Sequence, residues 1–549
     1  MKRVDIDIPR QDRDVLIVPD ARELPQLVRE NARAIGAYRV SLAGRPLVEL
    51  REAARREIMS AATEYTASLG VPAPAWRGEP IVETGHQPEF YHPGVWAKNH
   101  LCAKLAEAVG GIGLNLVVDN DVPREEELTF PVHAHGAFTQ HGVHFAPTDR
   151  TRAWEEHTDK ALWQFDHLAG EVKDLLPIAD ETLIIEPFMT DVTHCMSEAR
   201  DTGHLMTLLR RRYEETIGLR NLEIPTSVMC ETRAWALFVL SLVQKAERFA
   251  KIYNDAVHEY RRVNGVRSSS HPVPDLGVEE NRVELPFWVW TPGGERQRLW
   301  ITTKRDRTLL MDETPLFTID AATWPTLTSG DRKTFDKTAR RLLAEGKGHF
   351  RIRPRALSNT IFARMLLADV FIHGVGGAKY DTITDEIIRG FFGVEPPRLI
   401  ACSATVFLPI DVEASRQDDL RRLRWELRDV FYNADRHMSE ELRRSDRAEE
   451  LVTEKRRLVT RNRRLRSRVR ELGRTRTRAE RRGIFTDIRT HNAEMLQLIE
   501  DRVAALREEL ERVEHHVGDA AVVRQRGYPF VLYPEQQLLD FYAESIRFG

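Results

Sequence analysis

The chain has 549 residues, of which 42% are hydrophobic, and its formal net charge is −3. This length predicts two or three folded units, with enough apolar residues for ordinary cores. The near-balanced charge argues against a protein that binds nucleic acid through a basic character of the whole molecule, so nucleic acid is not an expected partner.

Four cysteines, Cys102, Cys195, Cys230 and Cys402, lie far apart in the sequence. This spacing argues against a disulfide framework and a zinc knuckle, and it suits a reducing compartment. Residues 1–20 carry charges throughout and lack the apolar centre of a signal peptide. No window approaches the roughly 18 apolar residues of a membrane span. We therefore expect a cytoplasmic protein without membrane contact.

The elements predicted before residue 80 are a strand at 15–18 and helices at 21–33 and 47–69. A strand over 80–84 then leads through a polar turn into an amphipathic helix from about Val95 to Val109. The apolar run 114–118 is typical of a buried parallel strand. Strand, helix and strand form a βαβ unit, whose two strands both end in polar clusters at one edge of the sheet.

The first polar cluster lies in the segment Ile81–Asn99. Its candidate site residues are Gly85, His86, Gln87, His92, Lys98 and Asn99. A helix start favours anions such as phosphate or carboxylate, because its first N–H groups are unpaired and its dipole is positive there. His86 is the first candidate for acid–base chemistry, and Lys98 is a candidate catalytic cation. The alternative is a well-capped connection without a functional role.

The second cluster, Asp119, Asn120 and Asp121, directly follows the predicted strand 114–118. These side chains could hold Mg²⁺, a ribose or an ammonium group. Asp119 or Asp121 would then bind the amine or another polar part of a substrate, or a metal. Alternatively, Asp119 and Asn120 simply cap the next segment.

The third cluster is a predicted glycine-rich loop at residues 374–379, after a helix predicted over 360–370. It contributes the candidate ligand-binding residues Gly374, Gly376, Gly377 and Lys379. Backbone N–H groups and a lysine in such a loop can reach a phosphate. The loop matches neither the dinucleotide fingerprint nor the P-loop, so the cofactor stays unknown, with a nucleotide as one candidate.

Residues 124–345 are predicted as an insertion region, mostly helical. One long amphipathic helix is predicted over Thr232–Tyr260. Two apolar runs, 285–290 and 299–302, flank a Pro-Gly-Gly turn and predict a β-hairpin.

Eight histidines fall between His86 and His157, some at spacings that can bind zinc. No HExxH motif accompanies them, so we assign no metal ligand. Cys102 shares a helix face with Leu105 and Val109, which favours a buried core thiol over a nucleophile.

From about Ser415 to His516 the chain has no proline and scarcely a glycine. Leu451, Leu458, Leu465 and Leu472 recur every seven residues, and a second heptad pattern covers residues 499–513. A breaker zone from Gly473 to Gly483 separates the two patterns. We therefore predict that residues 415–516 form an antiparallel coiled-coil hairpin of two long helices.

The first arm of this hairpin is very rich in arginine. A charge run of this kind is typical of a solvated helical face, and contact with an acidic or RNA partner is the alternative. The apolar residues of the final segment, 517–549, predict that it docks back onto the core.

The run TGHQPEFYHPGVWAKN resembles the start of the bacillithiol synthase family, in which a helix and an apolar strand also follow. Thr84, Gly85, Gln87, Phe90 and Lys98 match the family's pattern. The loop GVGGAKYD and the long charged coiled coil are also similar to those of the family. The resemblance implies a Rossmann-like core, a coiled coil that pairs the subunits of a homodimer, and ligation of an amino acid to an amino-sugar conjugate. The family's acidic cluster contains a histidine that Asp119-Asn120-Asp121 lacks, which indicates a distant branch with a different substrate.

Together these features predict an α/β protein with a Rossmann-like parallel-sheet core. Residues 1–123 and 346–414 would form the two halves of that core. The leading function is a bacillithiol-synthase-like enzyme that forms a C–N bond between an amino acid, or similar small metabolite, and an amino-sugar-type acceptor. One alternative is a nucleotide- or sugar-phosphate transferase that uses the same sheet edge. The other is a non-catalytic coiled-coil scaffold.

Overall fold

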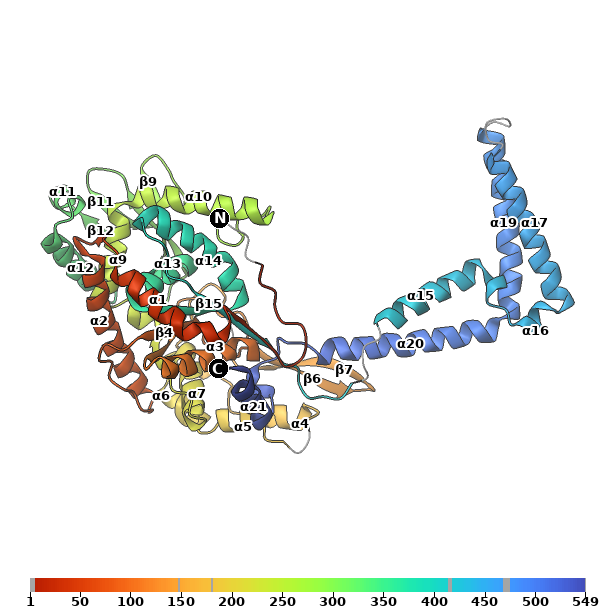
Figure 1. Cartoon of the computed structure of the whole chain (residues 1–549), viewed down its shortest axis with the longest axis horizontal. Coiled ribbons are helices and arrows are strands. Elements are labelled where there is room, and N and C mark those ends of the chain that lie inside the picture. Colours follow the sequence, from red (N-terminus) through yellow and green to blue (C-terminus); the bar gives the residue numbers. More distant parts are fainter. Residues whose placement is uncertain (1–4, 147–148, 179–180, 413–416, 468–473, 549) are drawn as a thin grey trace. The chain divides into compact units, whose positions relative to one another are not determined.

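A six-stranded sheet organises the first of two structural units (Figure 1). The computed structural model describes residues 5–146, 149–178, 181–412, 417–467 and 474–548. The first unit comprises Met1–Phe130, His141–Pro409 and Gln525–Gly549, and the second comprises Pro131–Gln140 and Ile410–Arg524. The chain is a mixed α/β protein with a parallel-strand sheet, as predicted.

The strands of this sheet lie in the order β1–β15–β14–β4–β5–β8. They are β1 (Asp14–Val18), β4 (Ile81–His86), β5 (Ile112–Val117), β8 (Leu222–Pro225), β14 (Val370–His373) and β15 (Ile400–Thr405). All neighbouring pairs are parallel except β1 with β15 at the edge. From β4 the chain adds β5 and β8 on one side, and later adds β14 and β15 on the other. The direction of strand addition therefore reverses between β4 and β14.

The strands predicted at 15–18, 80–84 and 114–118 are confirmed as β1, β4 and β5. β5 is an apolar run because its side chains are buried on both faces of the sheet. β8 lies within a region predicted as mostly helical. It is only four residues long, and its buried Glu223 interrupts the apolar pattern that would have marked a strand.

Helix α3 (Pro93–Ala108) connects β4 to β5 and confirms the βαβ unit. Pro93 suits the first turn because the N–H that it lacks would have no helical partner there. The helix is buried over most of its surface, whereas the sequence predicted an amphipathic helix. The C-terminal segment explains the difference: Phe530 stacks on Trp96 with ring centroids 4.3 Å apart, and the Tyr542 hydroxyl donates to the Pro93 carbonyl at 2.7 Å.

A second, antiparallel sheet has the order β12–β11–β10–β9–β13. Its strands are β9 (Arg282–Trp290), β10 (Gln297–Thr302), β11 (Arg307–Met311), β12 (Thr314–Ile319) and β13 (Arg351–Pro354). The predicted hairpin is confirmed as β9 and β10. β13 carries two arginines in four residues and so lacks an apolar pattern. The buried position of Arg353 is compensated because its guanidinium donates to Glu155 at 2.8 Å.

The predicted helix at Thr232–Tyr260 is two helices, α9 (Arg233–Gln244) and α10 (Ala246–Asn264), because Lys245 leaves helical geometry at φ −128° and ψ 35°. The predicted loop at 374–379 is instead the first turns of helix α14 (Val375–Ile387), which Gly374 caps. The helix predicted over 360–370 begins earlier, as α13 (Ala356–Phe362), and a wider turn at Ala363–Leu367 ends it before β14.

The other elements fit between these. The remaining helices are α1 (Leu24–Gly36), α2 (Leu47–Ser68), α4 (Leu168–Leu175), α5 (Ile185–Phe188), α6 (Val192–Glu198), α7 (Thr202–Thr216), α8 (Thr226–Met229), α11 (Thr323–Thr328), α12 (Arg332–Gly346) and α21 (Glu535–Ser545). Two small hairpins are β2 (Ser41–Leu42) with β3 (Arg45–Pro46), and β6 (Glu127–Ala134) with β7 (Ala137–His144).

The second unit contains helices α15 (Gln417–Tyr432), α16 (Glu440–Arg443), α17 (Asp446–Ser467), α19 (Arg474–Leu498) and α20 (Glu500–Val523). α17 lies beside α19 (Figure 1). Ion pairs and hydrogen bonds join Arg447 to Glu494 and Asn462 to Arg481, so these two helices run antiparallel. α15 packs against α20 in the same way.

This pairing corrects one prediction. The heptad segment around Leu451–Leu465 packs against α19, and residues 499–513 belong to α20, whose partner is α15. The breaker zone is also misplaced, because α19 continues through Gly483. Ser415, Leu472 and Gly473 lie outside the described residues. Among the described helices, none is both long and apolar enough to cross a membrane.

Candidate functional site

A cavity of about 660 Å³ opens where β4, β5 and β14 end, at the point where the strand order reverses. This volume is in the usual range for small-molecule sites. Open α/β sheets bind ligands in the crevice outside the carboxyl ends of their strands at such a reversal. All the lining residues belong to the first unit.

The turn after β4 contributes Gly85, His86 and Gln87 to the cavity. Gly85 is required where β4 and β5 approach closely, since a Cβ there would lie 2.8 Å from the Leu116 carbonyl oxygen. Burial, and then the nearby Lys98, hold the pKa of His86 well below its ordinary value. His86 is therefore a neutral imidazole at physiological pH, and a neutral imidazole can accept a proton.

Helix α3 places His92 and Lys98 on the same cavity. His92 caps the helix, because its Nδ1 accepts a hydrogen bond from the Gly94 N–H at 3.0 Å. Lys98 is 3% exposed, and its Nζ donates to the Gly85 carbonyl at 2.7 Å. No carboxylate pairs with it among the described residues, and burial lowers its pKa from 10.5 to about 8.

The end of β5 contributes Asn120 and Asp121. Asp121 accepts hydrogen bonds from Gln87 Nε2 and Arg296 Nη1, both at 2.8 Å. Burial alone would raise the pKa of Asp121, but Arg296, Gln87 and the Val122 N–H hold it below the ordinary value. Asn120 is buried, and its Oδ1 has no partner among the described residues, which leaves an acceptor at the cavity.

The end of β14 contributes His373 and the first residues of α14: Gly374, Gly376 and Gly377. A Cβ at Gly374 or Gly376 would meet nothing within 4 Å, so backbone faces open space there. At Gly377 a Cβ would lie 2.7 Å from His373 Nδ1, so that glycine allows the imidazole to pack. This arrangement brings free N–H groups of a helix start to the cavity.

Three predicted site residues are not brought to the cavity. Asn99 donates to Glu214 Oε1 at 2.9 Å inside the core, and Lys379 lies on the surface, 3.6 Å from Asp7. Asp119 accepts hydrogen bonds from the backbone N–H and the hydroxyl of Ser227. Burial, and then Glu155, raise the pKa of Asp119 to about 8. Asp119 therefore does not cap the segment that follows it either, because its partner Ser227 lies 108 residues further along the chain.

Several cavity residues were not singled out from the sequence. Two guanidinium groups lie near the Trp288 ring, Arg296 at 5.0 Å and Arg355 at 4.2 Å from its centre. Arg526, from the C-terminal segment, donates to Ser403 and to the Ala404 carbonyl, both at 2.9 Å. These residues come from the second sheet and the C-terminal segment, where the sequence holds no motif. Arg296 and Arg355 are paired with Asp121 and Glu284, whereas Arg526 brings a cation whose partners are a hydroxyl and a carbonyl.

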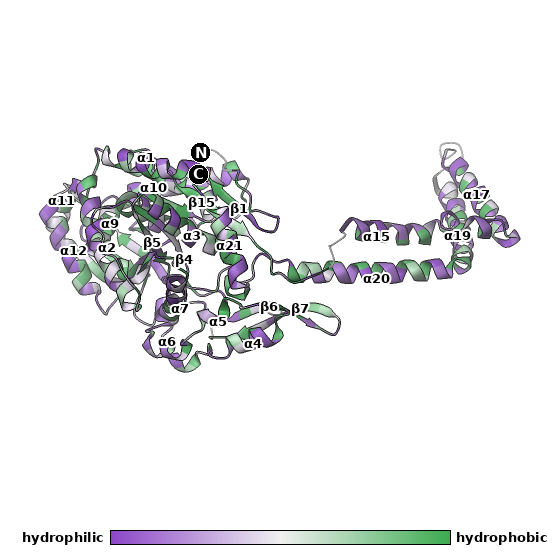
Figure 2. Cartoon of the chain, turned by 60° about the horizontal axis from the view of Figure 1, so that its bottom comes forward, coloured by the Kyte–Doolittle hydropathy of each residue, from purple (hydrophilic) through white to green (hydrophobic). Residues whose placement is uncertain are grey.

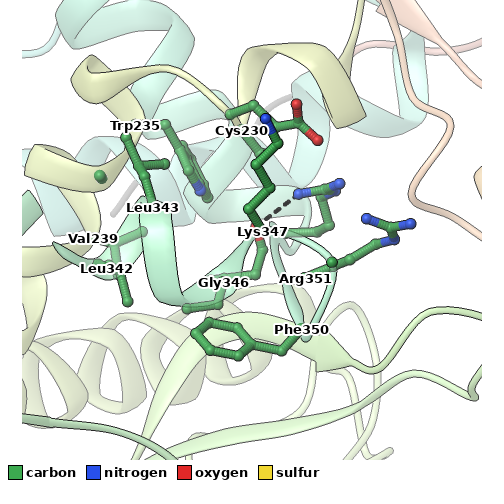
Figure 3. A pocket seen from close by; sticks show the side chains of 14 residues that line it. Cys230, Trp235, Val239, Leu342, Leu343, Gly346, Lys347, Phe350 and Arg351 are labelled. Carbon is green, nitrogen blue, oxygen red and sulfur yellow. Dashed lines mark hydrogen bonds between the residues drawn. The ribbon is translucent and has the colours of Figure 1, made fainter. Parts of the chain in front are cut away.

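A second pocket, of about 260 Å³, lies beside α9 and α12 (Figure 3). Trp235, Leu343 and Phe350 line it. Cys230 also lines it, but its pKa is raised well above the ordinary value by burial, so the thiol is unreactive. Arg351 and Arg353 also line it, but both are paired with carboxylates, Glu156 at 2.6 Å and Glu155 at 2.8 Å. We consider the larger cavity, at the carboxyl ends of the parallel strands, the better candidate.

The described residues contain no group of three or more histidines, cysteines or carboxylates placed to hold a metal. All four cysteines are free and buried, and Cys102 is the core thiol that its helix position predicted. No protein-family model matches the chain, and no curated protein matches its sequence.

Proposed function

We propose that the large cavity is the active site of a small-molecule enzyme of bacillithiol-synthase type, which joins an amino acid or similar metabolite to an amino-sugar-type acceptor. The observation that carries this proposal is Lys98, a buried lysine in a ligand-sized cavity to which the described part of the chain supplies no carboxylate partner. Strongly shifted titratable groups cluster at functional sites. The reaction type itself rests on the resemblance of TGHQPEFYHPGVWAKN to that family.

An anionic substrate group fits the environment of Lys98. Burying a cation is costly unless an opposite charge accompanies it, so an incoming carboxylate or phosphate would restore the charged form of Lys98. The open backbone at Gly374 and Gly376 and the basic Arg526 support the same ligand chemistry.

The remaining polar groups suit a reaction of an amine. The ionised Asp121 offers a carboxylate that can hold an ammonium group. The neutral His86 can accept a proton from a substrate ammonium group, which makes the resulting amine a nucleophile. In this proposal His86 is the catalytic base, and Lys98 and Asp121 position the two substrates.

The architecture that the resemblance implies forms part of the proposal. The strand order, with its reversal between β4 and β14, supports a Rossmann-like core. The antiparallel pairs α17–α19 and α15–α20 support a coiled-coil region. Trp425 and Tyr432 on α15 are 63% and 66% exposed and lie seven residues apart on one helix face, which supports a homodimer contact.

A nucleotide- or sugar-phosphate transferase is the second candidate. Trp288, with Arg296 and Arg355 near its ring, favours it, because an aromatic ring beside guanidinium groups suits a planar base and its phosphates. The two candidates share Lys98 and the glycines of α14, and they differ in the ligand.

Native mass spectrometry of the purified chain tests these proposals. We expect a bound amino acid, amino sugar or nucleotide in the wild type, and its loss in Lys98→Met. Lys104→Met is the matched control, since Lys104 lies on the same helix but donates to the Tyr542 carbonyl outside the cavity. An amino acid and an amino sugar would support the ligase, and a nucleotide alone would support the transferase.

Turnover provides the second measurement. Once a substrate pair is found, His86→Ala should abolish formation of the joined product while ligand binding persists. Unchanged turnover would remove His86 from the mechanism. If neither the wild type nor Lys98→Met binds any small molecule, the remaining candidate is the non-catalytic coiled-coil scaffold.

A further inference from the structure

The second unit carries a cluster of exposed arginines on two antiparallel helical stretches, residues 456–467 of α17 and 477–489 of α19. We call it the arginine face. It consists of exposed arginines: Arg456, Arg457, Arg461, Arg463, Arg464, Arg466, Arg478, Arg482 and Arg489. Figure 2 shows α17 as mostly hydrophilic. The two stretches contain only two acidic residues, Glu480 and Asp487.

Few arginines of the arginine face have an acidic partner among the described residues, and the same holds for some other exposed arginines of this unit, such as Arg428 and Arg512. Among the described residues, only Arg457 of the nine has an acidic partner, Glu454 at 3.4 Å. Further exposed arginines of the unit do pair, such as Arg424 with Glu514 at 2.9 Å and Arg502 with Glu426 at 2.7 Å. Interspersed charges of both signs would be enough to keep such a helical surface soluble.

The density of charge matches a phosphate backbone. A helix rises about 1.5 Å per residue, so 456–467 spans roughly 18 Å. The arginine face then offers about one net positive charge per 2 to 3 Å, which lies between the roughly 1.7 Å per charge of a duplex and the roughly 3.4 Å of one strand. All nine cations are arginine, whose planar fork binds phosphate through two hydrogen bonds.

An exposed aromatic ring accompanies these charges. Phe485 is 48% exposed on α19, and the Arg481 guanidinium lies 5.8 Å from its ring centre. An aromatic ring within a basic surface is a platform on which an unpaired base can stack. A duplex cannot present a base in this way, and an acidic protein has none to present.

We propose that the arginine face binds single-stranded nucleic acid, with arginines on the phosphates and a base stacked on Phe485. The net charge of the whole chain is −3 although the arginine face is basic, because the remainder of the chain carries an excess of acidic residues. The proposal does not depend on the function of the cavity.

Fluorescence anisotropy tests this proposal. It measures the binding of the full-length chain to a labelled 20-mer of uridine at several salt concentrations. Each phosphate contact contributes about 0.7 to the slope of log K against log salt for single strands. Arg461→Gln/Arg464→Gln should therefore lower that slope by about 1.4. Phe485→Ala should weaken binding about fivefold or more, because base stacking on an aromatic ring is lost.

The matched control is Arg29→Gln/Arg33→Gln, two exposed arginines on α1 of the first unit without acidic partners among the described residues. It should leave the affinity and the slope unchanged, and circular dichroism should show equal helix content in every variant. Absence of binding at low salt, or equal effects of the two double variants, would overturn the proposal. Tighter binding of a duplex or of polyglutamate would also overturn it, in favour of a different polyanion.

Discussion

Two buried cations of the first unit, Arg210 and Lys98, differ in the groups that accept their hydrogen bonds: carboxylates for Arg210 and a backbone carbonyl for Lys98. Arg210 donates to Glu214 and to Glu223, both at 2.6 Å. Burial alone would lower the pKa of Arg210, but these carboxylates raise it well above the ordinary value. Lys98 is equally buried, but its partner among the described residues is the Gly85 carbonyl, and its pKa falls to about 8.

A charge that the protein itself neutralises contributes to a fixed core. Glu214 also accepts from Trp96 Nε1 and Asn99 Nδ2, so the Arg210 network ties α7 to α3 and to β8. A charge left without a counter-ion is stabilised only when something else supplies one. Arg210 therefore belongs to the fold, whereas Lys98 needs a counter-ion that the proposed anionic ligand would supply.

Breaking the paired network should have the largest effect on stability. Arg210→Met leaves two buried carboxylates without their cation, and we expect a loss of about 3–5 kcal/mol in the free energy of unfolding. Arg220→Met is the control, because the Arg220 side chain is 71% exposed and its pair with Glu215 should contribute less than about 1 kcal/mol. Urea unfolding measures both, and similar losses would contradict the comparison.

Glu83 is a buried acid for which the described residues provide no ion-pair partner, as they provide none for Lys98. It is fully buried on β4, its two carboxyl oxygens have no hydrogen-bond partner among the described residues, and burial raises its pKa from 4.5 to about 8. The folded state therefore holds a proton that the unfolded chain releases, and stability falls as the pH rises from about 4.5 to 8. Glu83→Gln should remove this fall.

Relative to the wild type, we expect the free energy of unfolding of Glu83→Gln to rise by about 3 kcal/mol between pH 4.5 and pH 9. Unfolding free energies at the two pH values measure the gain. A wild type and variant with parallel pH profiles would mean that Glu83 is ionised in the folded state.

Lys98→Met should have the smallest effect, and of the opposite sign to Arg210→Met. The folded pKa lies below the unfolded value of 10.5, so the wild type is destabilised below about pH 8 and regains stability between about pH 8 and 10.5. We expect the variant to be about 1–3 kcal/mol more stable at pH 7, with the difference lost near pH 11. Destabilisation at pH 7 would mean that Lys98 has a structural role.

Much of the site could be predicted because parallel strands end at a common edge. The turn after β4, Asn120-Asp121 and the glycines of α14 were each found from local sequence, and the strand order brings them to one cavity. Arg296, Arg355 and Arg526 could not be found, because they arrive from a β-turn, a helix start and the C-terminal segment without a local pattern. Asn99 and Lys379 have suitable chemistry, but their positions around a helix direct them elsewhere.

The amino-acid sequence by itself determined the local elements with strong periodicity: the strands β4 and β5, the hairpin β9–β10 and the helical character of residues 417–523. Only the tertiary structure decided which helices pair, since heptads specify an apolar face and not the partner that covers it. It also decided which charges are neutralised, because Lys98 and Arg210 differ in what the fold places within hydrogen-bond distance. That distinction makes the segment around Lys98 a candidate site and the segment around Arg210 a core.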